Sequence, residues 1–96
     1  MIVSFGDPTT EALFHGTRDS RTRRIPVEIQ RGVARKLDML HAAEILEDLQ
    51  APPGNRLEAL RGELKGRHSI RVNDQWRLVF RWTTHGPAEV RLVDYH

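Results

Sequence analysis

Arginines alternate along the second half of the chain in a pattern that could bind phosphate. A guanidinium is planar and permanently charged, so it can bind two phosphate oxygens at once and can also stack on a nucleobase. The pattern is suited to RNA, but a GC-rich genome that favours arginine codons, or the ordinary polarity of an exposed sheet face, would also explain it. The set comprises Arg67, Arg71, Arg77, Arg81 and Arg91, with Tyr95 in the same alternation.

The positive charge is concentrated in the second half of the chain, although the formal net charge is only +2. Residues 1–50 carry 7 Arg or Lys against 8 Asp or Glu, a balance of −1, whereas residues 51–96 carry 8 against 5, a balance of +3. Of the 15 positive side chains, 13 are arginine. Like charges on neighbouring strands repel one another, so a sheet that carries these arginines with few acidic residues often has an anionic partner.

Three extended segments are expected to position the arginines. A period-two pattern starts at residue 67, turns at Asn73 and Asp74, resumes from Trp76 to Trp82, turns again at residues 85–87 and ends in a third run. Apolar side chains occupy one face of each run and the arginines the other, which predicts an antiparallel three-stranded meander. The apolar face holds Ile70, Val72, Trp76, Leu78, Phe80, Trp82, Val90 and Leu92.

The first half of the chain supplies the helices that would cover the apolar face. Residues 2–5 read as a short strand, and Asp7 followed by Pro8 predicts the start of a short helix. From Pro26, apolar residues recur at helical spacing through Leu49, which predicts one long or kinked helix before the break at residues 51–55. We therefore expect a single α+β domain over residues 1–96, with an N-terminal strand and two helices packed on one face of a twisted, mainly antiparallel sheet.

Several classes of protein are disfavoured by composition. Cysteine is absent, which excludes a disulfide framework, a thiolate nucleophile and a cysteine-ligated zinc site. The histidines lack the i, i+4 spacing beside a carboxylate that is typical of metal sites, so we expect no metal and no cofactor. No stretch approaches the roughly 18 apolar residues of a membrane span and no leader-like segment is present, which predicts a cytoplasmic protein without membrane contact.

Ordered motifs in the second half are specific enough to compare with known families. They are Gly54-Asn55-Arg56-Leu57-Glu58-Ala59-Leu60, Gly66, residues 69–82, and Val93-Asp94-Tyr95-His96, with residues 4–5 and 10–14 in agreement. This pattern resembles the HigB-type toxins of the RelE superfamily, especially the GraT-like members. The resemblance implies a RelE-like fold and cleavage of mRNA in the A site of the 70S ribosome. It also implies inhibition by a HigA-type helix-turn-helix antitoxin, through which the complex binds operator DNA.

The resemblance also implies which residues act. Metal-free RNA cleavage, in which a 2′-hydroxyl attacks the adjacent phosphate, needs a base, an acid and a cation. Arg77 matches the family's central-strand arginine and would stabilise the phosphate charge. Tyr95 and His96 match the terminal catalytic pair: histidine exchanges protons near neutral pH, and tyrosine would stack on a base or orient the hydroxyl. Asp94 is expected to hold His96 or Arg77 in place.

Two positions depart from the family pattern. Glu58 stands where some relatives carry histidine, and it is either a replacement general base or a structural carboxylate. Arg61 stands where some carry lysine, which preserves charge but not geometry. Together with the other basic residues of this half, the expected RNA-binding set is Arg56, Arg61, Arg67, Arg71, Arg81 and Arg91.

Three hypotheses about the function remain open. The first is the ribosome-dependent endoribonuclease, the second a non-catalytic module acting mainly in an operator-binding toxin–antitoxin complex, and the third a catalytically decayed relative that still binds the ribosome. Removal of His96 discriminates between the first two. The arginine-rich segment over residues 17–24 would contact ribosomal RNA, meet an acidic antitoxin segment or be mobile, and mobility is the default expectation.

Overall fold

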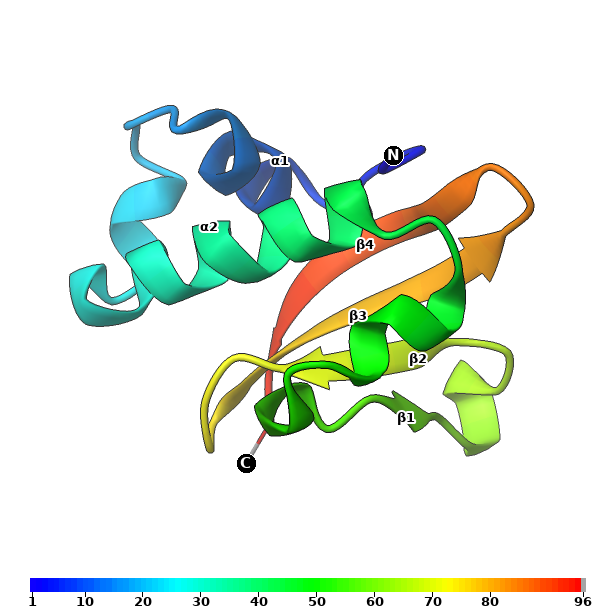
Figure 1. The fold of residues 1–96 in the computed structure, drawn as a ribbon. Helices are drawn as coiled ribbons and strands as arrows, with labels where there is room; N and C mark the ends of the chain where they lie inside the picture. Colours follow the sequence, from blue (N-terminus) through cyan, green and yellow to red (C-terminus); the bar gives the residue numbers. More distant parts are fainter. Residues whose placement is uncertain (96) are drawn as a thin grey trace.

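A computed structural model describes residues 1–95 of the chain. Within this range, helices α1 (Pro8–His15) and α2 (Val27–Ala42) precede strands β1 (Glu58–Ala59), β2 (His68–Arg71), β3 (Trp76–Thr83) and β4 (Gly86–Asp94). Short 3-10 helices occupy the connections: η1 (Thr22–Arg24), η2 (Leu46–Gln50), η3 (Pro53–Asn55) and η4 (Gly62–Leu64). Figure 1 shows α1 and α2 lying on one side of the sheet. The predicted two-layer α+β arrangement is confirmed.

Helix α1 begins where the sequence predicted. The Asp7 carboxylate accepts the backbone N–H of Thr10 at 2.7 Å, and Pro8 occupies the first turn. Gly16 ends the helix in the left-handed conformation (φ 71°), from which its N–H turns back to the carbonyls of the last turn. Asp7 and Gly16 thereby satisfy backbone groups that a helix leaves without partners at its two ends.

The prediction that the second helix continues through Leu49 was wrong. Helix α2 ends at Ala42, and Ala43 is already extended. One Asp48 oxygen accepts the backbone N–H groups of Glu44 and Ile45 at 3.0 and 3.2 Å, which favours a new turn over continuation of the helix. Leu49 nevertheless reaches the core from η2, with 1% of its surface exposed. Apolar spacing therefore identified a buried residue but not the backbone that delivers it.

The sheet is antiparallel in the order β1-β2-β3-β4. The predicted meander corresponds to β2, β3 and β4, whereas the two-residue β1 at one edge was not predicted. At the other edge the expected N-terminal strand is reduced to an extended segment with one parallel bridge, Phe5 to Val90. There, the N–H of Gly6 donates to the Val90 carbonyl at 2.8 Å and the N–H of Val90 donates to the Ser4 carbonyl at 3.1 Å.

The core lies between α2 and the apolar face of the sheet. Its fully buried members are Val33, Leu37 and Leu40 from α2 and Ile70, Leu78, Phe80 and Val90 from the strands. Trp82 packs against this core as predicted, whereas Trp76, at the start of β3, is half-buried and lies outside the cluster. Among the described residues no helix is both long and apolar enough to cross a membrane.

Candidate active site on the open sheet face

The open face, defined here as the side of the sheet away from α1 and α2, carries the predicted arginines. Residues directly opposite one another in an antiparallel sheet point to the same side. The register therefore aligns Arg71, Arg77 and Val93 in one row across β2, β3 and β4, and Glu58, Ser69, Val79 and Arg91 in the next. Ser69 and Val79 are fully buried at the centre of this face, so neighbouring side chains cover them.

Arg77 is the best-anchored cation of the open face, with only 12% of its side chain exposed. Its Nε donates to the Ser69 hydroxyl at 2.8 Å, and its Nη2 donates to the Arg56 carbonyl at 2.8 Å. Nη2 also lies 3.7 Å from Oε2 of Glu58. Among the described residues no acceptor binds Nη1, so this guanidinium is fixed in place while part of its donor fork is available to a phosphate.

Two of these contacts were missed by sequence reasoning. Ser69 alternates with arginines on β2, and its place two residues before Arg71 was the available signal for its position beside Arg77. The Arg56 carbonyl had no such signal, because it depends on the left-handed backbone of Arg56 (φ 45°, ψ 55°). Non-glycine residues rarely adopt this conformation. The structure thus adds Ser69 and the Arg56 backbone carbonyl to the predicted site as direct contacts of Arg77.

Glu58 lies at the edge of the site on β1, opposite Ser69 and with 57% of its side chain exposed. Its carboxylate is near enough to Arg77 to neutralise it in part, and it is accessible from solvent. This position is compatible with either role predicted for Glu58. Beside it, a shallow hollow is lined by Glu58, Ala59, Leu60 and Arg61, so Arg61 lies at the same sheet edge.

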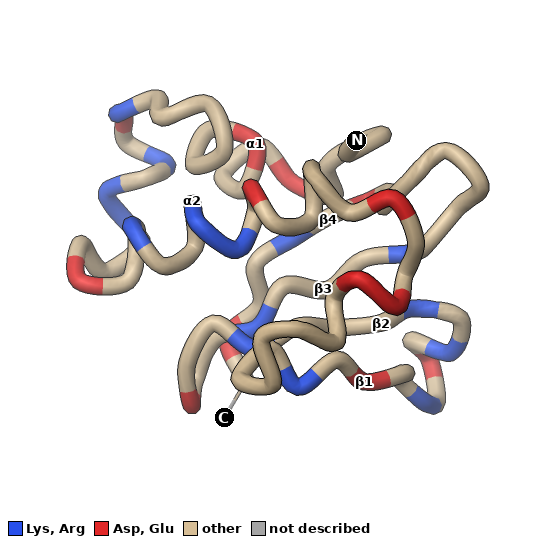
Figure 2. Tube along the Cα trace, viewed as in Figure 1, with Lys and Arg blue, Asp and Glu red and all other residues tan. Residues whose placement is uncertain are grey.

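Carboxylates are interleaved with the arginines, contrary to the expectation of little acidic dilution. Glu89 pairs with Arg67 at 3.3 Å and with Arg81 at 2.7 Å, and Arg71 pairs with Asp74. The hydrogen bond from Arg81, followed by that from Arg67, holds the pKa of the Glu89 carboxyl below its usual range. Figure 2 shows basic positions along β2, β3 and β4 with acidic ones on β1 and in the β2–β3 turn. The repulsion between these arginines is therefore offset within the protein.

Arg91 differs from the other four arginines of the meander, because it forms no ion pair with any residue over 1–95. Its stem packs close to Gly6, where an added Cβ would lie 3.3 Å from the Cβ of Arg91. Its stem thus lies beside the N-terminal segment, and no carboxylate among residues 1–95 pairs with its charge.

Asp94 and Tyr95 lie at the same end of the sheet as Arg77. The backbone N–H of Tyr95 donates to the Gln75 carbonyl at 2.5 Å, which extends the β3–β4 ladder past Asp94. Tyr95 is 38% exposed and lies two positions after Val93, the partner of Arg77. Strand alternation therefore directs its ring to the open face. Asp94 lies opposite Trp76 and accepts a hydrogen bond from Gln75 Nε2 at 3.2 Å. The predicted catalytic residue His96 lies outside the described residues.

Nothing in the part of the chain that the structure describes resembles a metal centre, since no three His, Cys, Asp or Glu side chains gather there. His41 Nδ1 accepts the N–H of Ile2 at 3.2 Å, and His68 stacks on Phe80 with ring centroids 6.3 Å apart. Both contacts are structural and lie away from the open face.

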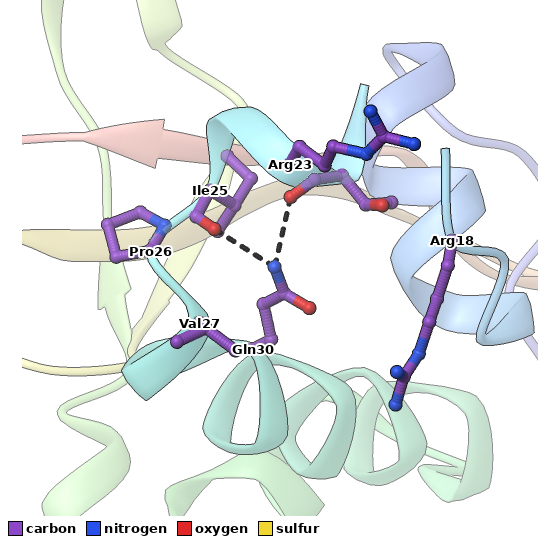
Figure 3. A pocket seen from close by; sticks show the side chains of 7 residues that line it. Arg18, Arg23, Ile25, Pro26, Val27 and Gln30 are labelled. Carbon is purple, nitrogen blue, oxygen red and sulfur yellow. Dashed lines mark hydrogen bonds between the residues drawn. The ribbon is translucent and has the colours of Figure 1, made fainter. Parts of the chain in front are cut away.

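A separate pocket lies on the helical side, between η1 and the start of α2 (Figure 3). Gln30 closes one wall, where its Nε2 donates to the carbonyls of Thr22 and Ile25 at 2.9 Å each. The preceding segment was expected to be mobile, yet Asp19 organises it by accepting from the backbone and the guanidinium of Arg21. The pocket is lined by Arg18, Thr22, Arg23, Ile25, Pro26, Val27 and Gln30.

Comparison with known proteins identifies the family. A sequence model described as "RelE-like toxin of type II toxin-antitoxin system HigB" matches residues 4–96. The chain belongs to this family of HigB toxins. The toxin is 48% identical over 96 residues to Toxin HigB-1 of Vibrio cholerae serotype O1, covering 100% of this chain and 98% of that protein. An uncharacterized Haemophilus influenzae protein is 44% identical over 59 residues, 62% of this chain and 58% of that one.

Structural comparison supports the same fold. The toxin superposes on a chain of the YoeB-YefM complex from Staphylococcus aureus with a TM-score of 0.61, covering 100% of this chain and 98% of that chain. Sequence identity is 14%, so this likeness concerns the fold alone. The expected RelE-like fold and the resemblance to HigB toxins are both confirmed.

Proposed function

We propose that the toxin is an endoribonuclease that cleaves mRNA in the ribosomal A site and is neutralised by a HigA-type antitoxin, which carries the complex to operator DNA. The observation that supports this most is the Arg77 guanidinium, held by Ser69 and the Arg56 carbonyl with Nη1 still available. A fixed donor fork on an open face stabilises charge as it develops on a phosphate without having to reorganise. Membership of the HigB family also supports this proposal.

In this proposal the reaction is the attack of a 2′-hydroxyl on the adjacent phosphate. Arg77 binds the phosphate oxygens through its free N–H groups. The Tyr95 ring, on the same face, stacks on a base or orients the hydroxyl, and His96 exchanges protons with the reacting oxygens. Glu58, 3.7 Å from Arg77, is placed to accept the proton of a hydroxyl brought to that guanidinium. Side chains thereby supply the base, the acid and the cation, so we propose metal-independent cleavage.

The remaining arginines would bind the RNA backbone. Arg91 has no ion-pair partner among the described residues, so it can bind a phosphate directly. Arg67, Arg71 and Arg81 would each release a carboxylate in order to bind one. Such an exchange is feasible because exposed ion pairs contribute only about 0.2–1 kcal/mol each. Arg56 and Arg61 would extend this RNA-binding surface along the β1 edge of the sheet.

The ion pairs favour a second candidate function. Because Glu89 and Asp74 satisfy three arginines without any nucleic acid, the open face is stable as it stands. A toxin that acts mainly as a non-catalytic component of an operator-binding antitoxin complex would need no more than this.

The test is induced expression in bacteria of the intact chain beside Arg77→Ala, Tyr95→Phe and His96→Ala, with growth measured and mRNA ends mapped. Growth arrest with cuts confined to translated frames, lost in folded variants, is the expected result. In vitro, the purified toxin should cleave mRNA on programmed ribosomes but leave the same mRNA intact without them. If none of the four chains slows growth and antitoxin binding is retained, the result would favour the second candidate function.

A further inference from the structure

A buried polar pair connects α2 to the loop that carries Arg56. Lys36 and Asn55 are 7% and 0% exposed, and Lys36 Nζ donates to Asn55 Oδ1 at 2.5 Å. No carboxylate among residues 1–95 forms an ion pair with Lys36. Burial, and to a smaller extent the charge of Arg35, lowers the pKa of Lys36. An amine placed in the core with an amide as its partner is costly and calls for an explanation.

Asn55 uses the rest of its side chain to organise the loop. Its Nδ2 donates to the carbonyls of Leu49 and Ala51 at 3.2 Å each, and its backbone N–H donates to the Pro52 carbonyl at 2.9 Å. One amide therefore joins α2, the end of η2 and the chain entering η3. Well-packed apolar residues would often stabilise a core as much as such a pair, so its distinctive effect is to fix one loop conformation.

The conformation that it fixes is the one that contacts Arg77. Arg56 follows Asn55 directly, is left-handed, and donates its N–H to the Pro53 carbonyl at 3.1 Å. Its own carbonyl accepts from Arg77 Nη2 at 2.8 Å. Two residues later, Glu58 lies 3.7 Å from the same atom. A shift of the loop would move both of these Arg77 contacts together.

We propose that the Lys36–Asn55 pair is a positioning device that aims the Arg77 guanidinium through the Arg56 carbonyl. Neither residue reaches the open face, so both act through Arg77. The catalytic consequence rests on the proposed endoribonuclease function, but the positioning itself is a property of the protein without RNA. The two are tested by separate measurements.

The first measurement is the hydrogen exchange of the Arg77 Nε–H, which bonds to Ser69 and becomes accessible when loss of the Arg56 anchor lets the guanidinium turn. It is followed by NMR in the folded protein and assigned by its loss in Arg77→Lys. The variant is the double substitution Lys36→Met/Asn55→Leu, which removes both polar groups and leaves no buried charge. We expect this Nε–H to exchange at least about tenfold faster, the factor that corresponds to losing roughly 1.4 kcal/mol of protection. Gln30→Leu, on α2, is the matched control, because it also removes two hydrogen bonds from a side-chain amide to backbone carbonyls, but away from Arg77.

The second measurement is single-turnover cleavage of mRNA on programmed ribosomes. We expect the rate at saturating toxin to fall by up to about 100-fold in the double variant, as for a misplaced catalytic group, with little change in the half-saturating toxin concentration. Gln30→Leu should cleave like the intact chain. If the intact chain does not cleave, the proposed function fails, and the exchange measurement still decides the positioning role.

Unchanged Arg77 Nε–H exchange in the folded double variant would overturn the proposal, whatever the cleavage rate. If the double variant does not fold, Lys36→Met alone serves, because it keeps both hydrogen bonds that Asn55 Nδ2 donates to backbone carbonyls. We then expect an intermediate acceleration of exchange, and an unchanged value would remove Lys36 from the device.

Discussion

The toxin carries arginines in two regions that treat them differently. On the open sheet face, Arg67, Arg71, Arg77 and Arg81 are each paired with a carboxylate, and Arg77 is held by two further hydrogen bonds. Arg18 and Arg23 line the pocket on the helical side, and their side chains form no hydrogen bond or ion pair with any residue over 1–95. Val27, in the same lining, is 78% exposed. The first region positions charge in a fixed geometry, as chemistry requires. The second offers charge without fixing it, as adaptable binding requires.

The largest effect should follow from removing the fixed charge. Arg77→Ala is expected to lower the single-turnover cleavage rate by about 100-fold or more, because a preorganised donor to the phosphate is lost. Arg77→Lys should recover little of this, since an ammonium lacks the planar fork that reaches Ser69 and the Arg56 carbonyl together. Full activity of Arg77→Lys would mean that charge alone suffices and that the fixed geometry is irrelevant.

A smaller effect is expected from releasing paired charges on the same face. Glu89→Gln frees Arg67 and Arg81, so single-stranded RNA should bind about twofold to fivefold more tightly. Each freed arginine that neutralises a phosphate should also steepen the salt dependence by about 0.7 in logarithmic slope. Fluorescence anisotropy over a range of salt concentrations measures both. Glu63→Gln makes the same change of net charge in η4 and should leave the slope as it is.

The same variant has a predicted pH dependence. Because Arg81 and Arg67 lower the pKa of Glu89, its ion pairs contribute to stability above the ordinary titration range of glutamate. This contribution is lost as the pH falls through the lowered pKa. The melting temperatures of the intact chain and Glu89→Gln should therefore converge on acidification. If the difference between the two melting temperatures stays the same down to the lowest pH, Glu89 does not stabilise the fold through its charge.

A gradual effect is expected from the buried amine. Since the pKa of Lys36 is lowered by burial, the unfolded chain binds more protons than the folded one between that value and the ordinary range of lysine. The free energy of unfolding should then rise with pH across this interval. Urea denaturation in mildly alkaline buffers should reveal the rise in the intact chain. Lys36→Met should lack it, and an identical rise in that variant would assign the effect to another group.

The smallest effect on cleavage should come from the unfixed arginines of the helical side. The double substitution Arg18→Ser/Arg23→Ser is expected to change the single-turnover rate by no more than about twofold, because exposed positions without partners rarely contribute more than about 0.5 kcal/mol. A loss comparable with that of Arg77→Ala would erase the contrast between the two regions and would place this segment against the ribosome.

Prediction from the sequence succeeded where one periodicity governed a whole element. The alternation of arginines and apolar residues placed β2, β3 and β4 and their core face, and the Asp7-Pro8 pair placed the start of α1. It failed where a single side chain redirected the backbone. Asp48 competes for the N–H groups of Glu44 and Ile45 and ends α2 early, which apolar spacing does not encode.

The candidate site shows the same division. The positions of Arg77 and Tyr95 on one face follow from strand alternation, so their common face was predictable. The contact between Arg77 and the Arg56 carbonyl was not, because it depends on a left-handed residue and on the buried amide of Asn55 before it. The ion pairs of Glu89 were also missed, since Glu89 itself has a positive φ of 54° and lies where the β3–β4 register shifts.

The bridge between the N-terminal segment and β4 has a consequence for how the toxin is made. Ser4 and Gly6 bond to Val90, and Ser4 Oγ accepts the N–H of Glu89 across 85 positions of sequence. These partners cannot meet until residue 90 has been synthesised and has left the exit tunnel. Pairing such distant positions also carries a cost in loop-closure entropy, which slows folding. Synthesis is therefore well past Arg77 before β4 can pair with β3, the strand that carries this residue.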